Sequence, residues 1–71
     1  MTPAAYRLTL DAIGWSYVEV AERSGVSERT ARRWAAGTAD IPAPIAAWLR
    51  EVAAWHQAHP APAKVGQEEQ R

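Results

Sequence analysis

The chain has 71 residues, with eight basic and eight acidic side chains, two histidines and no cysteine. This length allows one domain, and the lack of cysteine excludes disulfides and thiolate metal sites as sources of stability. A chain this short buries only about 60% of its unfolded surface, so we expect tight helix packing or a partner subunit to stabilise it. The balanced charge argues against indiscriminate nucleic-acid binding, which depends on net positive charge.

The first predicted helix covers residues 3–13. Thr2 suits the N-cap position, Pro3 suits the first helical position, and Gly14 can end the helix in the left-handed conformation. Apolar side chains recur on one face of this segment at helical spacing, namely Tyr6, Leu10 and Ile13.

Two further helices are predicted over residues 16–24 and 27–36, with a turn at Gly25 between them. Each begins at a capping serine, and the string from Ser16 to Glu19 has the sequence of a capping box. The inward stripe of the earlier helix comprises Tyr17, Val20 and Ala21.

The helix over residues 27–36 has two contrasting faces. Ala31 and Trp34 are its apolar positions, and we expect Trp34 to belong to the core. Opposite them is a locally basic surface of three arginines and one glutamate, made by Glu28, Arg29, Arg32 and Arg33. A helix, a glycine turn and a basic helix are typical of a helix-turn-helix, which presents its second helix to the major groove of DNA.

A fourth helix is predicted from about residue 42 to residue 58, with Asp40 or Ile41 at the cap. Its apolar stripe comprises Ile45, Trp48, Leu49, Val52 and Trp55. Residues 60–71 contain two prolines and a glycine and lack periodicity. We therefore expect an all-α bundle of four or five helices, with a DNA-binding domain over residues 1–58 and a flexible tail over residues 59–71.

The spacing of Ala21, Gly25 and Ala31 resembles the helix-turn-helix of the Xre-like family of lambda-repressor and Cro-like regulators. The likeness covers about residues 4–55. Ser24 departs from it, because the family usually has leucine there, and Ala31 is smaller than the usual isoleucine or valine. The resemblance implies an all-α fold and a small DNA-binding transcriptional regulator.

The resemblance also implies which side chains meet DNA. By family position, base contacts come from the outward residues of the basic helix, which are Glu28, Arg29, Arg32 and Arg33. Arginine can bind guanine O6 and N7 with two hydrogen bonds, and glutamate can accept one from the cytosine amino group. The positive N-termini of the two helices favour phosphate contacts from Ser16, Tyr17, Ser27 and Thr30.

The expected function is sequence-specific binding of double-stranded DNA by a homodimeric repressor on a palindromic operator. The expected dimer interface uses the surplus apolar surface of Ile45, Trp48, Val52 and Trp55. The resemblance implies autoregulation of an operon of phage type or associated with anti-CRISPR genes.

Two alternative functions stay open. In an antitoxin-like protein-interaction module Arg29 and Arg33 would be dispensable, and in a low-specificity architectural DNA binder affinity would barely change with sequence.

Enzymatic, metal and membrane functions are not expected. The sequence has no convincing catalytic set and no glycine-rich phosphate loop, and His56 and His59 have no third metal ligand nearby. We therefore expect no cofactor, metal or small-molecule ligand. No apolar run approaches the roughly 18 residues of a membrane span. The N-terminal segment lacks an apolar signal core, so a cytoplasmic, nucleoid-associated location is expected.

Overall fold

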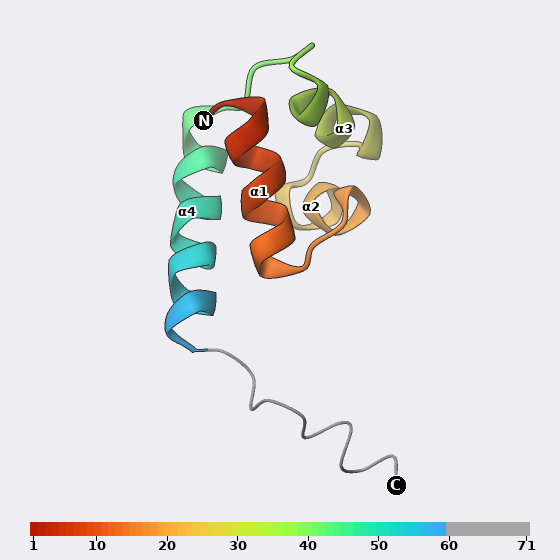
Figure 1. Cartoon of the computed structure of the whole chain (residues 1–71). Coiled ribbons are helices and arrows are strands. Elements are labelled where there is room, and N and C mark those ends of the chain that lie inside the picture. Colours follow the sequence, from red (N-terminus) through yellow and green to blue (C-terminus); the bar gives the residue numbers. More distant parts are fainter. Residues whose placement is uncertain (60–71) are drawn as a thin grey trace, which may run out of the picture.

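Four α-helices make up most of residues 1–59, the part of the chain that the computed structural model describes (Figure 1). They are α1 (Pro3–Ile13), α2 (Tyr17–Ser24), α3 (Glu28–Ala36) and α4 (Ala43–Ala58). These residues contain no β-strand, so the predicted all-α fold is confirmed. The predicted flexible tail lies outside the described residues from residue 60 onward.

Helix α1 lies at the centre of the bundle, between α4 on one side and the α2–α3 pair on the other (Figure 1). Helices α1 and α4 run side by side in the same direction, and α2 packs mainly on α3. This arrangement leaves α3 on the opposite side of α1 from α4. None of the helices in residues 1–59 combines the length and the hydropathy that a membrane-spanning segment requires.

The first three helices begin at hydroxyl caps, as the sequence predicts. The side-chain oxygens of Thr2, Ser16 and Ser27 accept hydrogen bonds from backbone N–H groups three residues later, at 3.0, 3.2 and 3.1 Å. Each bond satisfies an amide donor that the helix itself leaves unpaired. The Glu19 side chain of the predicted capping box forms an ion pair with Arg23 of the same helix, with 3.7 Å between a carboxylate oxygen and a guanidinium nitrogen.

Helix α4 starts differently from the prediction. Its N-cap is Pro42, without a side-chain capping bond, so the assignment of the cap to Asp40 or Ile41 is wrong. The Pro42 carbonyl accepts the first helical bond from the Ala46 N–H at 3.0 Å, which defines the start of the helix. Pro44 lies within the first turn, where a missing N–H is tolerated.

The core is centred on Tyr6, whose side chain is fully buried. Its ring stacks on Tyr17 with centroids 6.4 Å apart and meets Trp34 edge-on at 6.0 Å. Its hydroxyl donates a 3.0 Å hydrogen bond to the Ala31 carbonyl oxygen. Burial, and to a smaller extent the neighbouring Tyr17, raises the pKa of Tyr6 to about 12. One side chain of α1 therefore fixes both α2 and α3.

Helix α4 is fixed to the other side of α1. Leu49 is fully buried, and Ala46, which the predicted apolar stripe omitted, is buried too. Trp48 packs against Trp15 with ring centroids 5.5 Å apart, and the Arg23 guanidinium lies 4.7 Å from the Trp15 ring. The tryptophans thus link α4 to the α1–α2 connection.

Candidate nucleic-acid interface

The turn between α2 and α3 is short because Gly25 adopts a left-handed conformation, with φ of 74°. The N–H groups of Gly25 and Val26 both donate to the Ala21 carbonyl, at 3.0 and 3.1 Å, which closes the end of α2. Ala21 and Ala31 are both buried, and side chains this small let the two helices approach closely. These contacts form a helix-turn-helix over residues 17–36.

Helix α3 buries one face and exposes the other. Ala31, Trp34 and Ala35 are buried in the core, so the three arginines of the helix point outward into solvent. Those arginines line a shallow hollow of about 460 Å³, together with Glu28, Ala36 and Thr38. All four residues predicted to contact bases therefore lie together on one surface, which we call the α3 basic face and define as Glu28, Arg29, Arg32 and Arg33.

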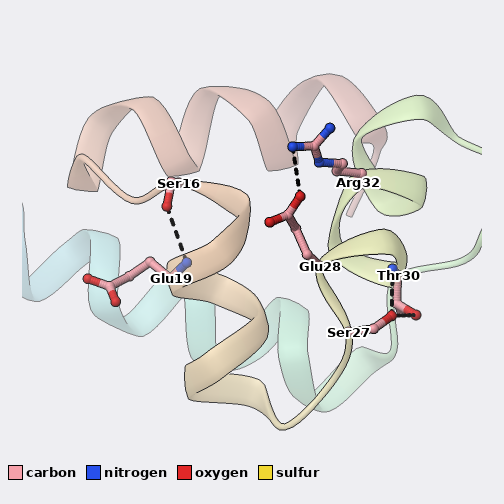
Figure 2. A network of polar contacts seen from close by, with 6 residues as sticks. All are labelled: Ser16, Glu19, Ser27, Glu28, Thr30 and Arg32. Atoms are coloured by element: carbon pink, nitrogen blue, oxygen red, sulfur yellow. Dashed lines mark hydrogen bonds and ion pairs between the residues drawn. The ribbon is translucent and has the colours of Figure 1, made fainter.

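The charges of the α3 basic face are not equivalent. Glu28 and Arg32 form an ion pair with 2.7 Å between Oε2 and a guanidinium nitrogen, and Figure 2 shows the two side chains directed toward each other. Among residues 1–59 the second ion pair joins Glu19 to Arg23, so Arg29 and Arg33 take part in neither. Within residues 1–59, the face thus carries two guanidinium groups outside both ion pairs and one that is neutralised locally.

The predicted phosphate contacts divide into two groups. Ser16 and Ser27 are exposed caps at the N-terminal ends of α2 and α3 (Figure 2), and Thr30 lies beside Ser27 with 3.0 Å between their hydroxyl oxygens. Tyr17 is half-buried, and its ring packs against the core. The capping serines are therefore exposed at the surface, whereas much of the Tyr17 side chain packs against the core.

Thr38, which lines the hollow, and Arg7, which contacts the end of α3, were not predicted as functional residues from the sequence. Thr38 follows α3 and lines the hollow, and its N–H donates to the Arg33 carbonyl at 3.1 Å. Arg7 of α1 donates a hydrogen bond from its guanidinium to the Ala35 carbonyl in the last turn of α3. A cation there complements the negative end of the helix dipole. The separation of Arg7 and Ala35 along the chain explains why no local pattern indicated this contact.

The four residues predicted to form a dimer interface differ in exposure. Ile45, Trp48 and Val52 are half-buried against the core, whereas Trp55 is 62% exposed. The Trp55 ring stacks on His59 with centroids 4.5 Å apart.

Within residues 1–59, no group of three potential metal-binding side chains, counting His, Cys, Asp and Glu, is close enough to hold an ion.

Residues 5–39 match the family model of a homeodomain-like domain. The match runs from α1 through α3 and the start of the following loop, and it supports a helix-turn-helix DNA-binding family. Domains of this kind are typically non-enzymatic. No curated protein and no solved structure matches the chain.

Proposed function

We propose that this chain is a sequence-specific DNA-binding transcriptional regulator that inserts α3 into the major groove. The α3 basic face carries the proposal, since its residues are held outward on a helix whose other face is buried. A major groove about 12 Å wide accepts an α-helix, and Arg29 and Arg33 could each bind a guanine edge with two hydrogen bonds. The homeodomain-like match over residues 5–39 supports this docking mode.

Phosphate contacts would hold the helix in place in the groove. Ser16, Ser27 and Thr30 are at or next to helix N-termini, where backbone N–H groups and the helix dipole favour anions. We assign these three residues and Tyr17 to the phosphates that border the groove. Such contacts would fix orientation without reading sequence.

The proposed regulator is a homodimeric repressor on a palindromic operator, with α3 of each subunit in major grooves about 34 Å apart. The exposed Trp55, continuous along α4 with Ile45, Trp48 and Val52, supports a contact between copies. The spacing of Ala21, Gly25 and Ala31 supports an Xre-like regulator. On that basis, we propose autoregulation of an operon of phage type or associated with anti-CRISPR genes, in the cytoplasm at the nucleoid.

Selection of duplexes from a randomised pool by the full chain tests this proposal. We expect enrichment of one sequence that contains an inverted repeat, with half-sites separated by about one helical turn. Binding without enrichment would contradict sequence specificity and favour an architectural DNA binder. Absence of DNA binding at low salt would contradict the proposal altogether and favour a protein-interaction module.

A further inference from the structure

One of the three arginines on the α3 basic face is held by a carboxylate of the same helix. The Glu28–Arg32 distance of 2.7 Å is shorter than the 3.7 Å of the Glu19–Arg23 pair. Glutamate four residues before arginine is the favoured orientation for such a pair, and Glu28 in the first turn also complements the helix dipole. The fold therefore holds Glu28 where it can reach Arg32.

The Glu28–Arg32 ion pair is not explained by a contribution to folding stability. Both side chains are well exposed, 43% for Glu28 and 64% for Arg32, and an exposed ion pair of this kind contributes little to folding. Its main consequence is electrostatic and local. The carboxylate neutralises one guanidinium of the surface that would approach DNA, whereas Arg29 and Arg33 are in neither ion pair of residues 1–59.

We infer that Glu28 is a specificity-determining residue that acts through Arg32: its carboxylate holds the Arg32 guanidinium on α3 and withholds that charge from DNA phosphates. Nonspecific affinity grows with the number of phosphates that basic side chains neutralise. With Arg32 held, this chain, in which acidic and basic side chains are equal in number, binds a random-sequence duplex weakly. Its affinity for DNA then depends on the base contacts of Arg29 and Arg33. This inference rests on the DNA binding proposed above and assigns Glu28 a different role from a direct base contact.

A comparison of four proteins tests the inference: the wild type, Glu28→Gln, Arg32→Gln and the double variant. The matched control is Glu51→Gln, which changes net charge equally on an exposed position of α4, across α1 from α3 (Figure 1). Each protein is titrated at several salt concentrations with a random-sequence duplex and with the duplex enriched by the wild type. Far-UV circular dichroism checks that each variant is folded.

For Glu28→Gln we expect binding to the random duplex to tighten by roughly threefold to tenfold, with the salt slope steeper by about 0.9. Binding to the enriched duplex should tighten less, so that the specificity ratio falls. In the Arg32→Gln background, Glu28→Gln should have no further effect on the slope. Glu51→Gln should behave like the wild type.

Three outcomes would overturn the inference. Glu28→Gln could match Glu51→Gln, it could act equally in both Arg32 backgrounds, or it could weaken only the enriched duplex, as loss of a base contact would. If the wild type enriches no sequence, the proposed specific function fails, but the salt slopes on random duplex still decide whether Glu28 restrains Arg32.

Discussion

The Tyr6 hydroxyl of α1 donates a 3.0 Å hydrogen bond to the Ala31 carbonyl of α3, deep in the core. The bond joins residues that are distant in sequence and fixes the buried face of the helix whose opposite face carries the arginines. The position of the α3 basic face thus depends on a contact made on the other side of the same helix.

Replacement of Tyr6 by phenylalanine should lower the free energy of unfolding by about 1 kcal/mol, since the ring still fills its site but the hydrogen bond is lost. Urea denaturation at neutral pH measures the difference. Tyr17→Phe is the matched control and should have a smaller effect, because Tyr17 is only half-buried. An equal or larger loss of stability in Tyr17→Phe would show that the hydrogen bond of the Tyr6 hydroxyl makes no special contribution to the free energy of unfolding.

Stability should also fall at alkaline pH because of Tyr6. Its pKa is raised to about 12 in the folded protein, against about 10 when unfolded. The folded state therefore retains the proton more tightly. The stabilisation is complete below pH 10 and is lost as the pH rises toward 12, by about 2–3 kcal/mol in all.

Comparison of the wild type with Tyr6→Phe isolates this effect, because all other titrating groups are common to both proteins. The stability advantage of the wild type should shrink above pH 10 and change sign at about pH 11, because the loss from Tyr6 ionisation exceeds the roughly 1 kcal/mol contributed by its hydrogen bond. A difference that stays constant over this range would mean that the hydroxyl titrates normally.

The turn of the helix-turn-helix should be sensitive to the conformation of residue 25. Among residues 1–59, no heavy atom beyond Gly25 and its two chain neighbours lies within 4 Å of a Cβ placed on Gly25, so space for a side chain is available. The positive φ alone should make Gly25→Ala less stable by about 1–2 kcal/mol. Gly25→Asn should lose less, because asparagine tolerates this conformation. Equal losses in thermal unfolding would point to a cause other than backbone strain.

Trp55 should matter for association rather than for folding. At concentrations low enough to keep both proteins monomeric, Trp55→Ser should leave the thermal midpoint nearly unchanged, because Trp55 is largely exposed. At higher concentrations it should shift the proposed dimer toward monomer. Trp48→Ala should instead destabilise the fold, since Trp48 packs against Trp15. Sedimentation over a range of concentrations measures the mass. A wild type that is monomeric at every concentration, with and without DNA, would contradict the dimer.

Local patterns predicted much of this fold. The capping residues Thr2, Ser16 and Ser27 identified three helix starts, and apolar spacing identified most of the core. Helical periodicity also predicted that Ala31 is buried and that the arginines of α3 are exposed. The residues predicted to contact bases accordingly lie on one face of the helix.

Contacts between helices could not be predicted in the same way. The bonds of Tyr6 to Ala31 and of Arg7 to Ala35 depend on how α1 packs against α3, and no local periodicity encodes that packing. The half-burial of Trp48 likewise follows from its position beside Trp15. The spacing of Glu28 and Arg32 also suits an ion pair, whereas their family positions imply two independent base contacts.

In the proposed function, Arg29 and Arg33 give α3 its preference for one DNA sequence. The most direct test is the ratio of dissociation constants for the enriched duplex and a scrambled duplex, at one salt concentration, for the wild type, Arg29→Ala and Arg33→Ala. We predict a wild-type preference of at least about 1,000-fold. Each substitution should cost about 1–3 kcal/mol on the enriched duplex and relax the preference at a base pair. If both variants keep the wild-type ratio, α3 does not read the sequence through these arginines and the proposed mode of recognition is wrong.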